Sequence, residues 1–403
     1  MKQYVVIVGG ELFNKGAQAL TFTVVDKVKE RYPGVKIVLL SSMDYRRPEG
    51  EKRKYAFEIL PFPLDLKSDL LGGIYKSYDV LSAVLNKRKA NRDIRNKVTA
   101  ILSNCRALID ISGYALSSQR GKFNSLQYLL NLKIARKYRI PVYLFPQSYG
   151  PFEYGYLGNL IFHQQIKKEL SSVKEIYARE QDGLHNLQRL NLNNVKRSFD
   201  IVLQNNKPYN LSNIFIREQF AGKHPEILPE AVGIIPNVKI MKHGNEEALY
   251  KLYEGLVDHL LKNNKNIYFL RHSYEDNKVI QAMREKYPNE RQIFYLDHDY
   301  SCIEIDEMIK KFDFIIGSRY HSIVHAFKNY VPALVLGWAV KYDELLQAFG
   351  QTDYCFDVRK QIKTEEAISK IDTLLTRHKQ ESETIKKNYA KITENNIFDK
   401  LII

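Results

Sequence analysis

Residues 312–326 hold the densest group of chemically useful side chains in the sequence. A short apolar run over residues 312–316 predicts a buried strand that leads to Ser318, and Arg319 and His321 open the next helix. The free N–H groups of a helix start and a guanidinium together favour an anion. An imidazole beside them can exchange protons near neutral pH. His325, one turn further, could share a metal with His321, but no acidic residue follows in the zinc-protease pattern, so we interpret His325 as structural.

Further cationic or polar side chains follow other predicted strands. Arg179 ends the strand over residues 175–178, His272 comes after the strand over residues 266–270, and Lys341 follows a third strand. An arginine fork suits a phosphate or a carboxylate, and an ordinary surface charge is the alternative interpretation. Ligands of parallel sheets bind outside the carboxyl ends of the strands, so these side chains are candidates for one cleft.

Loops rich in glycine and proline supply the remaining candidates. The first strand leads through Gly-Gly to Asn14 and Gly16, where the backbone could approach an anion at a helix start. Gly113 follows another strand, and Gln147 and Ser148 lie in a constrained Pro-Gln-Ser-Tyr-Gly-Pro loop. Such loops hold polar groups in place for binding, and tight structural turns are the alternative.

Short apolar runs alternate with segments of helical spacing along most of the chain. This alternation predicts an α/β fold with parallel sheets that are covered by helices on both faces. We predict two Rossmann-like doubly wound domains that face a central cleft, with a C-terminal helix that returns across both. The expected parts are the domains at residues 1–205 and 231–375, a linker at 206–230 and a helical tail at 376–403.

Composition limits the class of protein and partner. The chain has 403 residues and a formal net charge of +15, from 61 Lys+Arg against 46 Asp+Glu. The length accommodates two or three domains, and the charge predicts an anionic partner: nucleic acid, lipid or a phosphorylated substrate. The three cysteines lie far apart without disulfide or zinc spacing, so we expect no metal and a cytoplasmic location. No apolar run approaches the ~18 residues of a membrane span.

A basic cluster follows an apolar stripe of helical spacing. The stripe comprises Ile74, Tyr78, Leu81 and Leu85, and the cluster comprises Lys87, Arg88, Lys89, Arg92, Arg95 and Lys97. A basic amphipathic helix can lie on an anionic bilayer, which predicts peripheral contact with the inner face of the cytoplasmic membrane. The alternative is a helix whose stripe packs on its own domain. Nucleic acid is disfavoured as a partner, because no recognised reading motif or aromatic platform accompanies the charge.

Taken in order, these segments resemble the polysaccharide pyruvyl transferase family. The resemblance covers roughly residues 5–350 and rests on Asn14-Lys-Gly16, Ile111-Ser-Gly113, Gln147-Ser-Tyr-Gly-Pro151, Ala178-Arg-Glu180 and Ser318-Arg-Tyr-His321, followed by Val331-Pro332 and Lys341. The chain departs from the usual family pattern at Ala17, at Gly113-Tyr114 and at Phe199-Asp200.

The resemblance implies both a fold and a reaction. Members of the family resemble GT-B glycosyltransferases and transfer the pyruvyl unit of phosphoenolpyruvate to two hydroxyls of one sugar, which forms a cyclic ketal and releases phosphate. It implies phosphoenolpyruvate as co-substrate, no cofactor, and a sugar acceptor of cell-surface polysaccharide synthesis, with a polyprenyl diphosphate as one carrier. It also implies that Arg179, Arg319, Ser318 and Lys341 bind the donor, that the C-terminal domain is the donor side and the N-terminal domain the acceptor side, and that His321 performs acid–base chemistry.

Two other functions stay open at this point. A GT-B glycosyltransferase that uses a nucleotide sugar would also set basic groups against a diphosphate, although the C-terminal half lacks an evident Glu in the nucleotide-ribose position. A non-enzymatic basic protein bound to a membrane surface or to nucleic acid would show affinity that falls steeply with salt and does not depend on His321.

Overall fold

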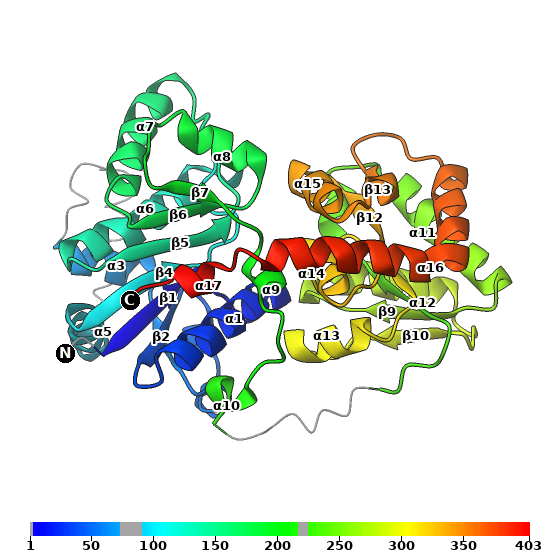
Figure 1. Cartoon of the computed structure of the whole chain (residues 1–403), viewed down its shortest axis with the longest axis horizontal. Helices are drawn as coiled ribbons and strands as arrows, with labels where there is room; N and C mark the ends of the chain where they lie inside the picture. The colour runs from blue at the N-terminus through cyan, green and yellow to red at the C-terminus, as the bar shows by residue number, and fades with distance from the viewer. Residues whose placement is uncertain (1–2, 73–90, 217–224) are drawn as a thin grey trace.

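The computed structural model describes residues 3–72, 91–216 and 225–403, which form two lobes built on two parallel sheets (Figure 1). The first sheet has seven strands and the second has six, and helices cover both. The predicted fold class, two doubly wound α/β units with a C-terminal helix that returns across them, is confirmed.

The strands of the first sheet run in the order β3-β2-β1-β4-β5-β6-β7. Their bounds are Tyr4–Val8 (β1), Lys36–Ser41 (β2), Glu58–Pro61 (β3), Cys105–Asp110 (β4), Val142–Gln147 (β5), Glu175–Ala178 (β6) and Val195–Arg197 (β7). The winding direction reverses between β1 and β4, which pair directly. A crevice outside the carboxyl ends of these two strands is the expected ligand position of this sheet.

The strands of the second sheet run in the order β10-β9-β8-β11-β12-β13. Their bounds are Ala231–Ile235 (β8), Asn266–Leu270 (β9), Ile293–Leu296 (β10), Phe314–Gly317 (β11), Ala333–Gly337 (β12) and Cys355–Asp357 (β13). Here the reversal lies between β8 and β11, so the segment after β11 leaves the sheet at its switch point.

Helices fill the connections between the strands. In the first lobe they are Lys15–Arg31 (α1), Glu49–Lys52 (α2), Leu64–Leu70 (α3), Arg92–Ser103 (α5), Lys122–Lys137 (α6), Tyr156–Leu170 (α7), Gln181–Gln188 (α8), Ile201–Gln204 (α9) and Leu211–Ile214 (α10). In the second they are Glu246–Lys262 (α11), Asn277–Lys286 (α12), Cys302–Ile309 (α13), Tyr320–Lys328 (α14) and Val340–Phe349 (α15).

Strand β1 shows how one sheet serves two cores. Its residues Val5 and Ile7 belong to a core that includes α1 and continues into the second lobe, whereas Val6 and Val8 belong to a core with α3, α5 and α6. This split follows from the two-residue period of a strand, which sends successive side chains to opposite faces. Helix α1 therefore packs between the lobes, and its first turn lies at their junction.

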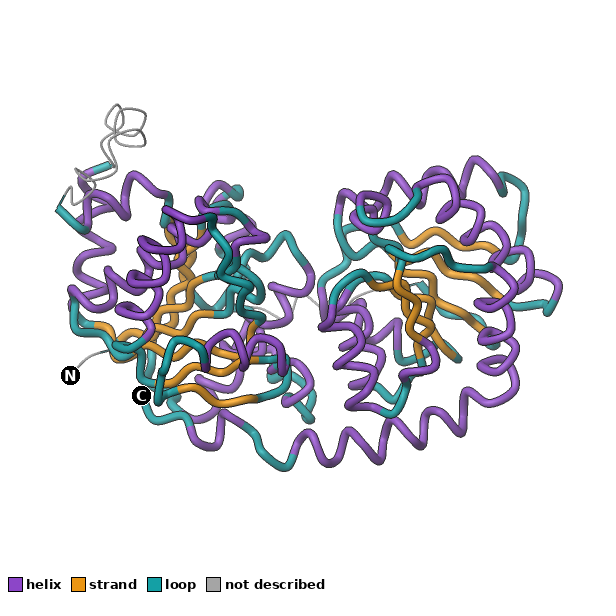
Figure 2. The backbone as a smooth tube through the Cα atoms, turned by 90° about the horizontal axis from the view of Figure 1, so that it is seen from above, coloured by secondary structure: helices purple, strands orange, loops and turns teal. Residues whose placement is uncertain are grey.

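The C-terminal segment ties the lobes together. Helix α16 (Thr364–Thr393) runs from the second lobe to the first, and α17 (Ile397–Lys400) packs beside the first sheet (Figures 1 and 2). The Phe398 ring packs edge-on against Phe145 of β5, and Arg31 of α1 donates to the Phe398 carbonyl oxygen at 2.7 Å. The tail thus stabilises the spacing between the two sheets.

Several local expectations differ from the structure. Gln147, expected in a loop, ends β5, because the register of β5 against β6 shifts between Leu144 and Gln147 and the strand continues past Pro146. The division expected between residues 375 and 376 falls inside the single helix α16. The domain bounds themselves stay a prediction.

The basic amphipathic segment is only partly described. The apolar stripe at Ile74, Tyr78, Leu81 and Leu85 and the basic run Lys87, Arg88 and Lys89 lie outside the described residues, as does part of the expected linker. Arg92, Arg95 and Lys97 are exposed on α5. In the part of the chain that the structure describes, no helix combines the length and the apolar character needed to cross a bilayer.

Candidate active site between the lobes

Arg179, at the carboxyl end of β6, is the centre of a buried polar cluster in the first lobe. Its Nε donates to Glu180 Oε1 at 2.7 Å, its Nη1 to Asp200 Oδ2 at 2.9 Å, and its Nη2 to Ser148 Oγ at 2.8 Å. Ser148 Oγ in turn donates to Glu180 at 3.0 Å. Burial disfavours the charge of Arg179, but Glu180, Tyr320 and Asp200 outweigh it and raise the pKa of the guanidinium. The cluster therefore holds a permanent cation in one orientation.

The second lobe meets this cluster through the first turn of α14. The Arg179 guanidinium lies 4.3 Å from the centre of the Tyr320 ring, and His321 Nε2 lies 3.4 Å from Asp200 Oδ2. Asp200 also caps α9, because its Oδ1 accepts the Val202 N–H at 3.0 Å. A carboxylate of one lobe thus lies against an imidazole of the other.

The environment of His321 sets its protonation. Burial lowers the pKa of its imidazole, and the partly compensating Asp200 carboxylate does not restore it. Burial also disfavours the charged form of Asp200, but His321 and Arg179 outweigh it and hold the pKa of that carboxyl well below its usual range. Because the His321 side chain keeps 16% of its surface exposed, a neutral imidazole faces the junction and can accept a proton there.

Gly16 makes room for His321. A Cβ added at this position of α1 would come within 2.3 Å of His321 Nδ1, so only a glycine permits this approach. Asn14 begins the same helix by accepting the Gly16 and Ala17 N–H groups at 3.0 and 3.3 Å. These two sequence candidates therefore shape the histidine side of the junction.

Lys341, in the first turn of α15, adds a second cation. Its Nζ lies 5.2 Å from the centre of the Tyr320 ring, and the described residues give it ring contacts but no ion pair. Burial lowers the pKa of this ammonium to about 7, and the nearby charge of Arg179 contributes. Glu344, one turn further along α15, accepts the Gln181 N–H at 2.6 Å and so holds α15 against the first lobe.

Ser318 and Arg319 lie at the switch point of the second sheet, but their side chains bond to other side chains of the protein. Ser318 Oγ bonds to the Tyr253 hydroxyl at 2.9 Å. Arg319 Nε donates to Asp276 Oδ2 at 3.0 Å, and its Nη2 donates to Asp276 and, at 2.8 Å, to Glu275. The guanidinium that was expected to meet a ligand therefore anchors the start of α14 through carboxylates.

The other sequence candidates lie in the walls of the junction. Gly113, at φ +67°, gives its carbonyl oxygen to the Ser148 N–H at 2.8 Å and so links the β4 and β5 loops. Gln147 is buried behind them and donates weakly to Asp110 at 3.4 Å. His272 is buried, and burial followed by the charge of Arg319 holds the pKa of its imidazole far below the usual value. In the described ranges, no group of three His, Cys, Asp or Glu side chains gathers as a metal site requires.

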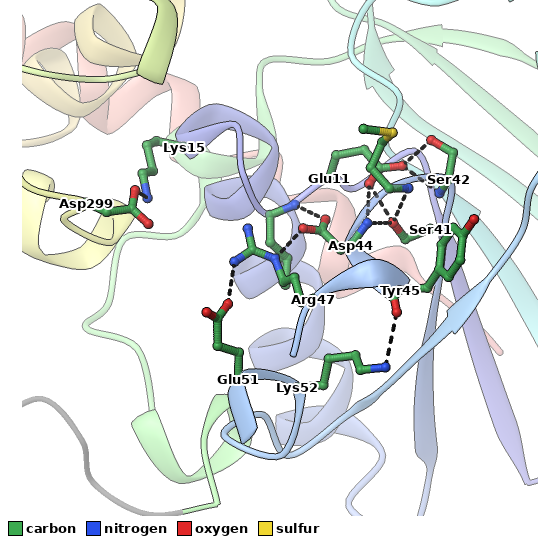
Figure 3. A network of polar contacts seen from close by, with 12 residues as sticks. Glu11, Lys15, Ser41, Ser42, Asp44, Tyr45, Arg47, Glu51, Lys52 and Asp299 are labelled. Carbon is green, nitrogen blue, oxygen red and sulfur yellow. Dashed lines mark hydrogen bonds and ion pairs between the residues drawn. The ribbon is translucent and has the colours of Figure 1, made fainter. Parts of the chain in front are cut away.

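A polar network supports the loops after β1 and β2 (Figure 3). The Glu11 carboxylate accepts from the Ser41 hydroxyl at 2.5 Å and from the Ser42 N–H at 2.8 Å, and Arg47 pairs with Asp44. These contacts fix the edge of the first sheet at its switch point.

Lys15, in the first turn of α1, reaches across to the second lobe. It pairs with Asp299 at 2.7 Å (Figure 3). Together with Gly16 beside His321, this pair ties the start of α1 to the second lobe.

Two residues of this site were not among the sequence candidates. Asp200 stands in the Phe-Asp pair noted as a departure from the family pattern, and Tyr320 lies between two residues that were selected. Neighbouring motifs signalled both.

The two-lobed fold is similar to that of several solved structures. The solved structures that match include the UDP-GlcNAc 2-epimerase of Methanocaldococcus jannaschii, at 12% identity and a TM-score of 0.56 over 93% of this chain and 92% of that one. A putative UDP-N-acetylglucosamine 2-epimerase of Listeria monocytogenes matches at 11% identity and a TM-score of 0.58, over 96% and 91%. UGT71G1 of Medicago truncatula, complexed with UDP-glucose, matches at 11% and 0.50, over 97% and 98%.

At these identities the likeness concerns the fold, which is of the GT-B type. A comparison with curated proteins finds no significant match. The family model of the polysaccharide pyruvyl transferases matches residues 14–339, most of the chain, from Asn14 to just past the His321 turn. On this match, the chain belongs to the polysaccharide pyruvyl transferase family.

Proposed function

We propose that this enzyme transfers the pyruvyl unit of phosphoenolpyruvate to two hydroxyls of one sugar during the synthesis of a cell-surface polysaccharide, with release of phosphate. The observation that carries the proposal is the pair of cations beside His321. Arg179 is fixed by three side chains, and Lys341 has no ion pair in the described part of the chain. Glu180 and Asp200 already pair with Arg179, so a small donor with a phosphate and a carboxylate would supply the counter-charge that Lys341 lacks.

The residues support a balanced reaction. A neutral His321 takes the proton of the first sugar hydroxyl as that oxygen bonds to C2 of phosphoenolpyruvate. In the same step the electron pair of the C2=C3 double bond takes that proton from His321, so C3 becomes a methyl group and His321 returns to its neutral form. The second hydroxyl then replaces the phosphate at C2, and its proton leaves with the phosphate. Positive charge that develops at C2 is stabilised by the carboxylate of the donor, and no cofactor is needed.

Other residues of the site act by positioning in this proposal. Asp200 orients the His321 ring, and Arg319 holds the first turn of α14 through Asp276. The N–H groups of that turn and the Lys341 ammonium receive the phosphate, while Arg179 faces the carboxylate. Ser148 keeps the Arg179 fork in its plane.

Phosphate release from phosphoenolpyruvate across a panel of free and lipid-linked sugars, with mass spectrometry of the product, tests the function. We expect release that depends on one class of acceptor and a product that carries one added ketal. Because a solved relative of the fold carries UDP-glucose, nucleotide sugars are the competing donors. Stabilisation of the enzyme against heat by phosphoenolpyruvate, but not by nucleotide sugars, supports the proposal, and the reverse pattern rejects it.

We also propose that the enzyme works at an anionic membrane face, where a polyprenyl-diphosphate-linked acceptor would lie. Exposed Arg92, Arg95 and Lys97 on α5 support this proposal. Each basic residue near such a surface contributes about 1 kcal/mol. Co-sedimentation with vesicles of anionic lipid should therefore exceed that with neutral vesicles, and the variant Arg92→Ser/Arg95→Ser should lose most of the difference. Equal sedimentation of both proteins would contradict the proposal.

A further inference from the structure

A cavity lies at the switch point of the first sheet, outside the carboxyl ends of β1 and β4. It encloses about 410 Å³, and its lining includes Gly9, Phe13, Met43, Lys67, Ser112 and Arg120. Gly9 has φ +80° and would clash with Ser112 if it carried a Cβ, so the backbone is shaped to keep the β1 and β4 loops in close contact. The cavity is of the size of a sugar-binding pocket.

Lys67 is the unusual residue of this cavity. Lys67 is 5% exposed, and its ammonium lies 4.8 Å from the centre of the Phe62 ring. Within the described ranges, its ammonium has neither a hydrogen bond nor an ion pair. Burial lowers the pKa of this lysine to about 8, so the side chain stays mostly charged at neutral pH. An ammonium that is buried without a hydrogen bond or an ion pair lowers the stability of the fold unless a ligand supplies the missing partner.

The two nearest carboxylates are already occupied. Glu11 accepts from Ser41, from the N–H and hydroxyl of Ser42 and, at 3.4 Å, from the Asp44 N–H (Figure 3). Asp110 accepts the Ser112 N–H at 2.9 Å, and burial raises its pKa to about 6. Both carboxylates therefore favour the charge of Lys67 from a distance without reaching it. An anion that enters the cavity would be its first direct partner.

The rim of the cavity suits a sugar. Phe13 and Met43 leave about half of their surfaces exposed, at 52% and 49%, and can face the C–H side of a pyranose ring. Arg120, exposed at the other side, adds a second positive charge. Such a mixture of apolar faces and a few placed polar groups is typical of small-molecule sites.

The cavity and the site between the lobes border the same loop. Ser112 and Tyr114 line the cavity, and between them the Gly113 carbonyl oxygen accepts the Ser148 N–H. Ser148 accepts in turn from Arg179 at 2.8 Å. A sugar bound in the cavity would therefore lie against the loop that also contacts the Arg179 cluster.

We propose that this cavity binds the acceptor sugar and that Lys67 selects an acceptor with an anionic group, either the phosphate that joins the sugar to its carrier or a carboxylate on the sugar itself. The proposal rests on the proposed pyruvyl transfer, because only that reaction makes the bound sugar an acceptor. The preference for an anionic sugar is a binding property of the cavity and can be tested without the reaction. Lys67 is the specificity-determining residue, and Arg120 assists at the rim.

Binding measured by titration calorimetry tests the preference without turnover. The background is His321→Gln with saturating phosphoenolpyruvate, which keeps anions away from Lys341. The probes are glucose 1-phosphate, glucuronate and neutral methyl glucoside. We expect at least one anionic probe to bind about 10- to 100-fold more tightly than methyl glucoside, the range of a charge-assisted hydrogen bond. Whichever probe shows the gain identifies phosphate or carboxylate as the recognised group.

Lys67→Met should remove this gain and leave the neutral probe unchanged, while Lys67→Arg should keep part of it. Lys168→Met, exposed on α7, is the matched control and should behave like the parent. Equal binding of charged and neutral probes, or a preference that survives Lys67→Met, would overturn the proposal. A failed pyruvyl transfer shows separately, as the absence of phosphate release with every acceptor, and leaves the calorimetric result readable.

Discussion

The contact between Gly16 and His321 offers a sharp test of the site. Gly16→Ala adds one methyl group to the first turn of α1, where the backbone is helical and accepts alanine. That methyl carbon would lie 2.3 Å from His321 Nδ1 and 2.6 Å from its Cγ. The substitution therefore acts directly on the ring assigned to proton transfer.

The size of the effect follows from the geometry. Ordinary contact begins at 3.4 Å, so the imidazole or α1 must move by about 3.4 − 2.3 = 1.1 Å. A displacement of about 1 Å of a catalytic group costs roughly 100-fold in rate. Overpacking costs about 1–3 kcal/mol, and the helix preference of alanine over glycine returns up to about 1 kcal/mol, so the variant should remain folded.

Steady-state phosphate release with saturating phosphoenolpyruvate measures the outcome. We expect kcat to fall about 100-fold, with a melting temperature within a few degrees of the wild type. Gly34→Ala is the control, because no atom of the described residues lies within 4 Å of the added methyl group there. If Gly16→Ala kept more than a third of the wild-type kcat, the placement of His321 against Gly16 would be irrelevant to the reaction and our reasoning would be refuted.

Two further predictions concern His321 and Lys341. His321→Gln should lower kcat by about 10²- to 10⁴-fold, the usual contribution of general acid–base catalysis, while binding of phosphoenolpyruvate in calorimetry stays close to wild type; unchanged kcat would remove His321 from the mechanism. Because the pKa of Lys341 is lowered to about 7, its ammonium loses its proton as the pH rises through that value, and the anionic donor then binds less well. The KM of the wild type for phosphoenolpyruvate should therefore rise above about pH 7, approaching tenfold per pH unit. The Lys341→Met variant should have a high KM that depends less on pH. A wild-type KM that stays constant from about pH 6 to pH 9 would contradict this assignment.

The sequence predicted the elements of the site well where the signal was local. Residues 312–326 formed a strand and a helix start as expected, and Asn14 caps α1, because apolar spacing and capping chemistry act over a few residues. The roles of individual side chains were harder to predict from the sequence. Arg319 was expected to face a ligand, but Asp276 and Glu275, which follow a different strand, hold its fork. That pairing depends on which strands become neighbours.

The alternation of short apolar strands with helices, together with the order of the motifs, was enough to establish two parallel sheets and the family. Only the tertiary structure brought Arg179 and Asp200 of the first lobe against Tyr320 and His321 of the second. It also showed that Lys67 is buried and that, in the described chain, its ammonium contacts the Phe62 ring but has no ion pair. The physical reason is the distance along the sequence over which each effect acts. Periodicity and capping are set by neighbours in sequence, whereas burial, charge pairing and the pKa of a side chain are set by groups hundreds of residues away that the fold places within a few ångströms.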